Sequence, residues 1–280
     1  MRVVMCGVRG STPAPGVDFV RYGGNTSCVA LAHDGAAPSL LLDAGTGLRR
    51  VTSLLDGVAF DGAILLSHLH WDHTHGLPFF PSGDRADARV DVFLPAQGDP
   101  LAVLSGAMSP PHFPITPDQL NGRWTFNSLE PGPHQIEGFS VLAAEIPHKG
   151  GRTFGYRVSD GHSTIAYLPD HCPTALGPGP DGLGERHPAA LSLAADVDLL
   201  IHDAQYTDDE MPAKGHFGHA ATTYAVRLAV EAGARRVVLF HHDPGRTDDQ
   251  VDAIVTHHRA QAPPVVVDGA AEEMVIELPL

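Results

Sequence analysis

The sequence predicts an α/β (α+β) fold in which two β-sheets pack face to face and helices cover their outer faces, a four-layer αββα sandwich. Three observations support it: short β-rich runs fill two halves of the chain, amphipathic segments accompany them, and 43% of the 280 residues are hydrophobic. No internal repeat and no long linker divides the chain, so we expect residues 1–280 to form a single domain.

The N-terminal half alternates strands with turns. Short β-rich runs bounded by Gly, Pro and Asp predict strands at 2–8, 27–34, 39–45, 63–67 and 90–96. Residues 47–57 carry apolar side chains at helical spacing and end in glycine, which predicts a helix.

The C-terminal half has the same layout. We expect strands at 139–148, 153–160, 163–169, 197–206, 236–242, 264–269 and 272–278, and helices at 219–234 and 247–262. The Gly/Pro-rich stretch from Pro173 to Pro188 predicts a surface loop.

The composition excludes several classes of protein. With 33 acidic and 18 basic residues the net charge is −15, which argues against a surface that binds nucleic acid through its phosphates. The three cysteines are odd in number and far apart, which is typical of reduced thiols. No run is apolar enough for a signal peptide or a membrane span, so we expect a soluble cytoplasmic protein.

The segment AILLSHLHWDHTHGLPFF, residues 63–80, carries the clearest functional signal. Four histidines and an aspartate lie within eight residues after an apolar run, and such a cluster is costly without a cation. Alternation along an extended segment turns His68 and His70 to one side, and the start of a helix turns Asp72 and His73 toward a neighbouring point. The segment therefore predicts two adjacent metal positions.

The HLHWDH sequence resembles the His-x-His-x-Asp-His motif of the metallo-β-lactamase superfamily. The resemblance implies an αββα sandwich with the metals at the edge between the sheets, and further ligands after later strands. His148, Asp170 and His241 occupy such strand ends. The resemblance also implies two bound divalent ions. Zinc is expected, and the same ligand types are compatible with manganese or iron. The implied ligands are His68, His70 and His148 for one ion and Asp72, His73 and His241 for the other, with Asp170 bridging.

Neighbours of these ligands leave alternatives open. His242 competes with His241, and we favour His241 because it is the first histidine at the strand end. Asp43 either orients a ligand histidine, as the resemblance suggests, or forms a turn before glycine. Trp71 is expected to pack beside the site without touching substrate, and His75 to have a structural role or to support a ligand from behind.

Two metal ions about 3.5 to 4 Å apart can hold a hydroxide between them, so hydrolysis is the default reaction. The superfamily also includes lactamases, thioesterases and flavin-iron oxidoreductases, so the motif alone does not select a substrate. Asp72 is expected to double as a base.

His219, in GHFGHAATTYAVRL, is predicted to stand at the start of a helix, where it would bind a phosphoryl oxygen or protonate the leaving oxygen. The segment resembles the Gly-His-Ser-Thr segment of the ribonuclease Z-like phosphodiesterase branch, with Ala220 in place of serine. His216 is a weaker rival.

The spacing of the later ligands bears on the substrate. In ribonuclease Z a long arm between the counterparts of His148 and Asp170 grips tRNA, whereas here only 170 − 148 = 22 residues separate them. This favours a small phosphodiester, and the chain resembles compact members that hydrolyse 3′,5′-cyclic nucleotides or other cyclic phosphodiesters. A ribonuclease Z-type RNA-processing endonuclease and a non-catalytic ligand sensor are the alternatives.

Two loops are predicted to shape the substrate pocket. The segment 7–28 offers N–H groups from a Gly-rich turn and the side chains of Arg21 and Asn25. The proline-stiffened loop 108–116 presents His112 and Phe113, which could cover the site or stack on a base. The expected partner is a small phosphodiester, without nucleic acid or membrane, and the family resemblance implies a homodimer.

Overall fold

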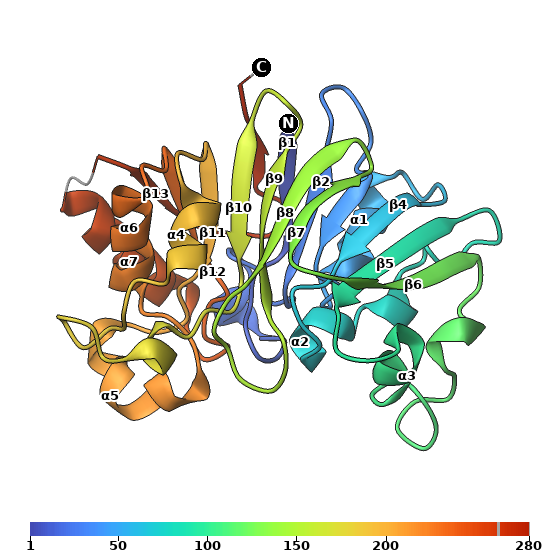
Figure 1. The fold of residues 1–280 in the computed structure, drawn as a ribbon, viewed down its shortest axis with the longest axis horizontal. Helices are drawn as coiled ribbons and strands as arrows, with labels where there is room; N and C mark the ends of the chain where they lie inside the picture. Colours follow the sequence, from blue (N-terminus) through green and yellow to red (C-terminus); the bar gives the residue numbers. More distant parts are fainter. Residues whose placement is uncertain (262–263, 280) are drawn as a thin grey trace.

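Two seven-stranded sheets form the centre of the protein in a computed structural model, which describes residues 1–261 and 264–279 (Figure 1). The first sheet has the strand order β14-β1-β2-β3-β4-β5-β6 and the second β13-β12-β11-β10-β9-β8-β7. The strands of the first sheet are β1 (Arg2–Gly7), β2 (Cys28–Ala32), β3 (Leu40–Leu42), β4 (Asp61–Leu65), β5 (Arg89–Pro95), β6 (Arg123–Leu129) and β14 (Val275–Glu277). Those of the second are β7 (Gly132–Ile136), β8 (Phe139–Glu145), β9 (Phe154–Ser159), β10 (Thr164–Leu168), β11 (Leu199–Asp203), β12 (Arg236–Phe240) and β13 (Val266–Gly269).

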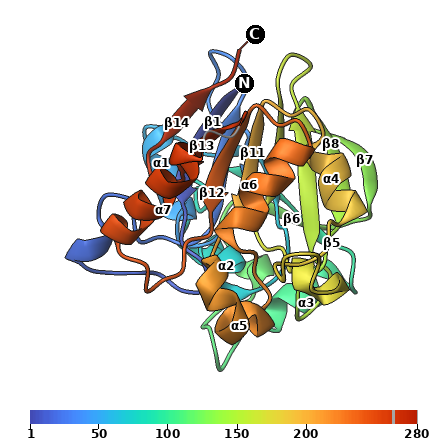
Figure 2. The ribbon, with the colours of Figure 1, turned by 90° about the vertical axis from the view of Figure 1, so that its left-hand side faces the viewer.

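Helices flank both sheets. α1 (Leu48–Leu54) and α3 (Pro100–Ser105) pack against the first sheet, and α4 (Pro188–Ala194), α6 (Thr222–Glu231) and α7 (Asp248–Ala260) against the second. Figures 1 and 2 show the latter three together over one outer face. The short helices α2 (Trp71–Thr74) and α5 (Met211–Lys214) lie in the lower half of both views.

Three apolar layers hold the fold together. The central layer joins the inner faces of the two sheets, and the outer layers lie between each sheet and its helices. Strand β10 shows how one run serves two layers: Ile165 and Tyr167 enter the central layer, whereas Ala166 and Leu168 face the helices. Strands buried on both faces therefore read as continuous apolar runs.

The predicted four-layer αββα sandwich is confirmed by this arrangement. The predicted helices at 47–57, 219–234 and 247–262 correspond to α1, α6 and α7, each shorter than expected, and residue 262 lies outside the described residues. Strands β6 and β7 and helices α3 and α4 were not predicted. Each of the two missed strands lies at the edge of its sheet, where part of the strand faces solvent and polar residues replace apolar ones.

Parallel pairing sets the position of the functional residues. Strands β3 to β6 are parallel to one another, as are β10 to β13, so the carboxyl ends of each group lie at one edge. Ligands of open α/β sheets bind outside these carboxyl ends. Within the described ranges, no helix has the length and hydrophobicity needed to cross a membrane.

Candidate metal centre

The predicted ligands meet at the carboxyl ends of parallel strands from both sheets. His68 follows β4 in the first sheet, and Asp170 and His241 follow β10 and β12 in the second. The HLHWDH segment leaves β4 extended and turns into α2 at Trp71, with His70 still in an extended conformation. Residues up to 173 positions apart in the sequence, 241 − 68, therefore surround one point between the sheets.

A first group of donors comprises His68, His70, His148 and Asp170, whose ligand atoms all lie within 4.8 Å of one another. Asp170 Oδ2 is 3.3 Å from His148 Nε2 and 3.6 Å from His68 Nε2. Burial lowers the pKa of each of the three histidines, so the imidazoles are neutral and able to bind a cation.

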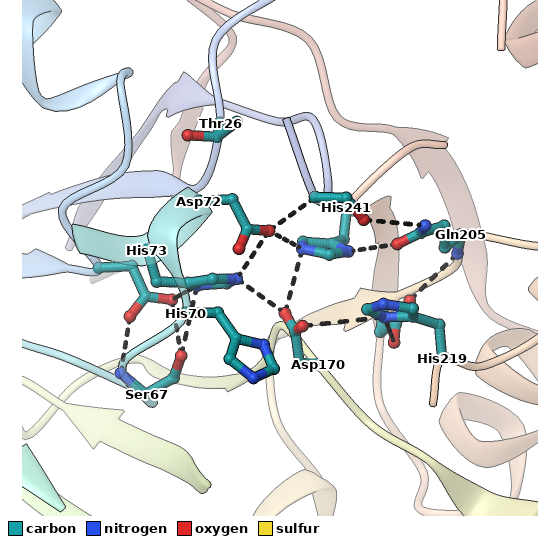
Figure 3. A network of polar contacts seen from close by, with 12 residues as sticks. Thr26, Ser67, His70, Asp72, His73, Asp170, Gln205, His219 and His241 are labelled. Carbon is teal, nitrogen blue, oxygen red and sulfur yellow. Dashed lines mark hydrogen bonds and ion pairs between the residues drawn. The ribbon is translucent and has the colours of Figure 1, made fainter. Parts of the chain in front are cut away.

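A second group shares Asp170 and adds Asp72, His73 and His241 (Figure 3). Asp170 Oδ1 lies 3.0 Å from His73 Nε2 and 3.1 Å from His241 Nε2. Asp72 Oδ2 lies 3.0 Å from His241 Nε2 and 3.3 Å from His73 Nε2. Asp170 thus turns one carboxylate oxygen toward each group, the arrangement expected of a ligand between two metal ions.

The charges and unpaired atoms of this cluster fit divalent cations. His68 Nε2, His73 Nε2 and Asp170 Oδ1 are buried without a hydrogen-bond partner, which is costly unless something else binds them. Burial would lower the pKa of His73, but the carboxylates of Asp72 and Asp170 outweigh it and raise the pKa well above its ordinary value. The pocket therefore holds excess negative charge, and its donors are those of a dinuclear centre.

Asp43 lies behind the second group, directly after β3. Its Oδ2 is 2.7 Å from His73 Nδ1 and accepts hydrogen bonds from Ser67 Oγ (2.9 Å) and the Tyr167 hydroxyl (2.8 Å). Its Oδ1 accepts a hydrogen bond of 2.6 Å from the backbone N–H of Ser67. With φ of 61°, Asp43 has the left-handed backbone that aspartate tolerates better than most residues. The bond to Nδ1 leaves His73 Nε2 facing the metal position.

Other ligands are oriented in the same way. His241 Nδ1 is 2.9 Å from Gln205 Oε1, and His148 Nδ1 is 2.8 Å from the backbone oxygen of Gly218. The backbone N–H of Ser11 donates to Asp72 Oδ2 at 2.6 Å. The Gly-rich loop 7–16 was predicted to offer N–H groups to a substrate, but this one is directed to a metal ligand.

His219 lines the cavity above the metal centre, which has a volume of about 600 Å³. Its Nδ1 lies 3.1 Å from Asp203 Oδ2 and 3.8 Å from Asp170 Oδ2. Burial lowers the pKa of His219, but the Asp203 carboxylate outweighs it and raises the pKa to about 9. The ring is therefore cationic at neutral pH, with Nε2 as its second N–H.

The surroundings of His219 differ from the prediction in one respect. Helix α6 begins at Thr222, three residues later, so His219 precedes the helix. The backbone N–H of Thr222 donates to the backbone carbonyl oxygen of Tyr206, and the backbone N–H of Ala220 donates to Asp203 Oδ2. The carboxylate of Asp203, rather than a helix terminus, holds this histidine.

The structure does not bring Arg21 or Asn25 to the metal cavity. The Arg21 guanidinium binds Asp249 and Asp252 of α7, and the Asn25 amide donates to Glu272 at 3.0 Å. These acidic partners lie more than 220 residues away in the sequence, so local patterns did not reveal them. His112 and Phe113 line a separate cavity that adjoins the metal centre.

The remaining histidines have distinct positions. His242 Nε2 lies 2.9 Å from the backbone oxygen of Ala270, away from the ligand groups, whereas His241 belongs to the second group. His171 Nδ1 lies 3.1 Å from His202 Nε2. His75 stacks on Trp71, with ring centroids 5.4 Å apart. Trp71 is 66% exposed and lines the metal cavity, so it is more accessible than a residue packed beside the site.

Sequence analysis missed Asp203 and Gln205, which hold His219 and His241. Asp203 ends strand β11 with the sequence LLIHD, the same position relative to a parallel strand that identified Asp170 and His241. That signal was available in the sequence. Gln205 carries no such signal, since an isolated glutamine after a strand is common at any surface.

The chain matches the model of the beta-lactamase superfamily domain over residues 39–242. It is 26% identical to ribonuclease Z from Salinibacter ruber over 258 residues, covering 76% of this chain and 78% of that protein. Human tRNase Z, short form, has 22% identity and a TM-score of 0.66, with 100% of both chains covered. A diphosphatase from the PhnP family has 17% identity and a TM-score of 0.68, covering 100% of this chain and 98% of that one. This chain therefore belongs to the metallo-β-lactamase superfamily, is similar in sequence to ribonuclease Z, and is a metal-dependent hydrolase with a histidine and aspartate metal site.

Proposed function

We propose that this protein is a phosphodiesterase that hydrolyses small cyclic phosphodiesters, 3′,5′-cyclic nucleotides first among them. The observation that carries the proposal is the position of Asp170 between two groups of histidines, on the floor of a cavity that His219 also lines. Two divalent ions bound there would stabilise negative charge at phosphorus and lower the pKa of a water molecule. Imidazole and carboxylate donors suit zinc, and they are also compatible with manganese.

The protein's own residues have separate tasks in this reaction. Asp72, which lines the metal cavity, is placed to orient a water molecule as a base. His219 is cationic because of Asp203, so its Nε2 can donate a proton to the departing oxygen. Asp43 and Gln205 hold His73 and His241 so that the ligand atoms do not have to reorganise.

Two features support a small substrate. Residues 149–169 are occupied by β9, β10 and their short connections, which leaves no room for a protruding arm that grips RNA. The net charge of −15 disfavours a long polyanion, because each additional phosphate adds repulsion.

A second candidate is RNA processing of the ribonuclease Z type. The comparisons favour it over a cyclic nucleotide substrate, since ribonuclease Z and tRNase Z are among the relatives and none of the proteins mentioned above is named for a cyclic nucleotide substrate. Both candidates require the same phosphodiester chemistry at the same residues.

The decisive experiment compares substrates on one preparation. The purified protein is stripped with chelator, restored with zinc or manganese, and assayed with 3′,5′-cyclic AMP, a 2′,3′-cyclic nucleotide and a precursor tRNA. Metal-dependent turnover of the cyclic substrates at a higher kcat/KM than cleavage of the tRNA supports the proposal. Efficient cleavage of the tRNA alone supports the second candidate. Two bound ions without turnover of any phosphodiester would contradict both and favour a ligand sensor.

A further inference from the structure

A second cavity, with a volume of about 350 Å³, adjoins the metal centre. Its walls come from the segment that follows the HLHWDH motif and from α3 with the loop after it. Leu69, between the ligands His68 and His70, lines both this apolar cavity and the metal cavity. The two cavities therefore meet at Leu69.

The lining of this cavity is uncharged. Leu77, Val103, Leu104 and Met108 contribute to it, and no aspartate, glutamate, lysine or arginine lines it within the described part of the chain. The metal cavity, by contrast, is lined by several charged side chains, among them Asp72, Asp170, Lys214 and Asp243. A charged phosphate thus belongs to the metal cavity, and an uncharged apolar group belongs to its neighbour.

Exposed aromatic side chains gather around these two cavities. Among the described residues the exposed large aromatics are Trp71 at 66%, Phe79 at 61% and Phe217 at 58%, and each lines one of the two cavities. Phe79 meets Phe113 edge to face, with ring centroids 5.9 Å apart at 89°. Exposed apolar side chains that cluster on one part of a protein surface are typical of an interaction or ligand-binding site.

The pair Trp71 and His75 forms part of the wall between the cavities. Trp71 lines the metal cavity, His75 lines the apolar cavity, and their rings stack at 18° to one another. Stacking restricts the rotation of the exposed indole, so a ligand can pack on it at a lower entropic cost. The surface next to the metals is therefore preorganised for an apolar group.

We propose that the apolar cavity binds the ester group that stays on phosphorus when that group is an uncharged aryl group, and that the protein prefers phosphodiesters that carry one. This proposal rests on the phosphodiesterase activity proposed above, and it adds the class of substituent. The contacts would come from Leu69, Phe79, Val103, Met108 and Phe113, and His112 would lie at the edge.

Two substrates with the same leaving group test this preference. Phenyl p-nitrophenyl phosphate and methyl p-nitrophenyl phosphate both release p-nitrophenolate, so the chemical step is matched and the retained group differs. Burial of a phenyl group predicts a kcat/KM at least about tenfold higher for the phenyl ester. Equal values for the two esters would overturn the proposal while leaving phosphodiester hydrolysis intact.

A pair of matched variants assigns the preference to this cavity. Val103→Asn places an amide in the cavity wall, whereas Val230→Asn makes the same change on α6, where Val230 is 40% exposed and lines neither cavity. We expect Val103→Asn to remove most of the preference for the phenyl ester and Val230→Asn to preserve it. A preference that survives Val103→Asn unchanged would place the phenyl group elsewhere and overturn the assignment.

A binding measurement separates this inference from the proposed function. Calorimetry of the zinc-loaded protein compares phenylphosphonate with methylphosphonate, neither of which has to be hydrolysed. If no phosphodiester is turned over but phenylphosphonate binds about tenfold more tightly, the apolar site stands and the activity assignment fails. Equal affinity for the two phosphonates rejects the apolar site regardless of turnover.

Discussion

Asp43 Oδ2 and His73 Nδ1 lie 2.7 Å apart, and neither side chain is accessible to solvent. The two residues are 30 positions apart: Asp43 directly follows β3, and His73 lies in α2, which follows the adjacent parallel strand β4. The contact directs the other nitrogen of His73 toward Asp72 and Asp170. The first group of donors has no comparable carboxylate behind His68, whose Nδ1 lies 3.1 Å from Ser67 Oγ.

Replacing Asp43 should weaken one metal position. Asp43→Asn keeps the size of the side chain and tolerates the left-handed backbone, but it loses the charge that orients His73. We expect the affinity of the second group for zinc to fall about 10- to 100-fold, measured by competition with a chelating dye. The matched control is Asp56→Asn, at an exposed aspartate with φ of 51°. Unchanged affinity in Asp43→Asn would show that His73 is oriented without this carboxylate.

Substitutions at Asp170 and at Asp72 should leave the protein with different numbers of bound zinc ions. Asp170→Asn weakens a donor of both groups, so we expect the dialysed variant to retain fewer than one zinc per chain. Asp72→Asn weakens the second group alone, and one ion should remain with His68, His70 and His148. Elemental analysis counts the ions, and thermal unfolding verifies that both variants are folded. Two ions in Asp170→Asn would contradict the bridging position.

The loss of activity on removing the His219 side chain should depend on the leaving group. An alkoxide leaving group needs a proton as it departs, whereas p-nitrophenolate is stable without one. We therefore expect His219→Ala to slow the hydrolysis of an alkyl ester about 10²- to 10⁴-fold, and that of a nitrophenyl ester much less. His216→Ala is the control, because His216 is exposed and outside the ligand groups. Steady-state kcat values on both ester types provide the measurement. An equal loss on both would assign His219 to binding or metal retention instead.

Glu210 should make stability depend on pH in the acidic range. Burial would raise the pKa of Glu210, but hydrogen bonds from Arg246, the Thr207 backbone and Lys214 outweigh it and lower the pKa to about 2, from an ordinary value near 4.5. Because the folded-state pKa is depressed, the stabilisation is present above about pH 4.5 and is lost as the pH falls toward 2.

The variant Glu210→Gln tests this linkage. At pH 7 we expect its free energy of unfolding to be lower than that of the wild type by on the order of 1 kcal/mol. The difference should shrink as the pH falls and should be small near pH 2. Urea denaturation at matched pH values measures it. A difference that stays constant across this range would mean that Glu210 acts through packing alone.

Much of the fold was predictable because its signals are local. Strands β4, β10 and β12 are buried on both faces, so their apolar runs stand out from the turns around them. The edge strands β6 and β7 were missed because one side of each faces solvent and their sequences are mixed. Helices α6 and α7 are long enough to show several turns of apolar periodicity and were found, whereas the shorter helices α3 and α4 were not.

The sequence by itself determined the candidate metal ligands, because a strand followed by a tight turn carries His68, His70, Asp72 and His73 within six residues, and later strand ends supply the other candidates. Only the tertiary structure decided what each remaining side chain contacts. Arg21, a plausible phosphate ligand by residue type, binds carboxylates of α7, and Asp203, unremarked in the sequence, holds His219. Backbone geometry orients neighbours along a chain, but partners 16 to 231 positions apart meet only when the two sheets and their loops pack, and that packing depends on the whole core.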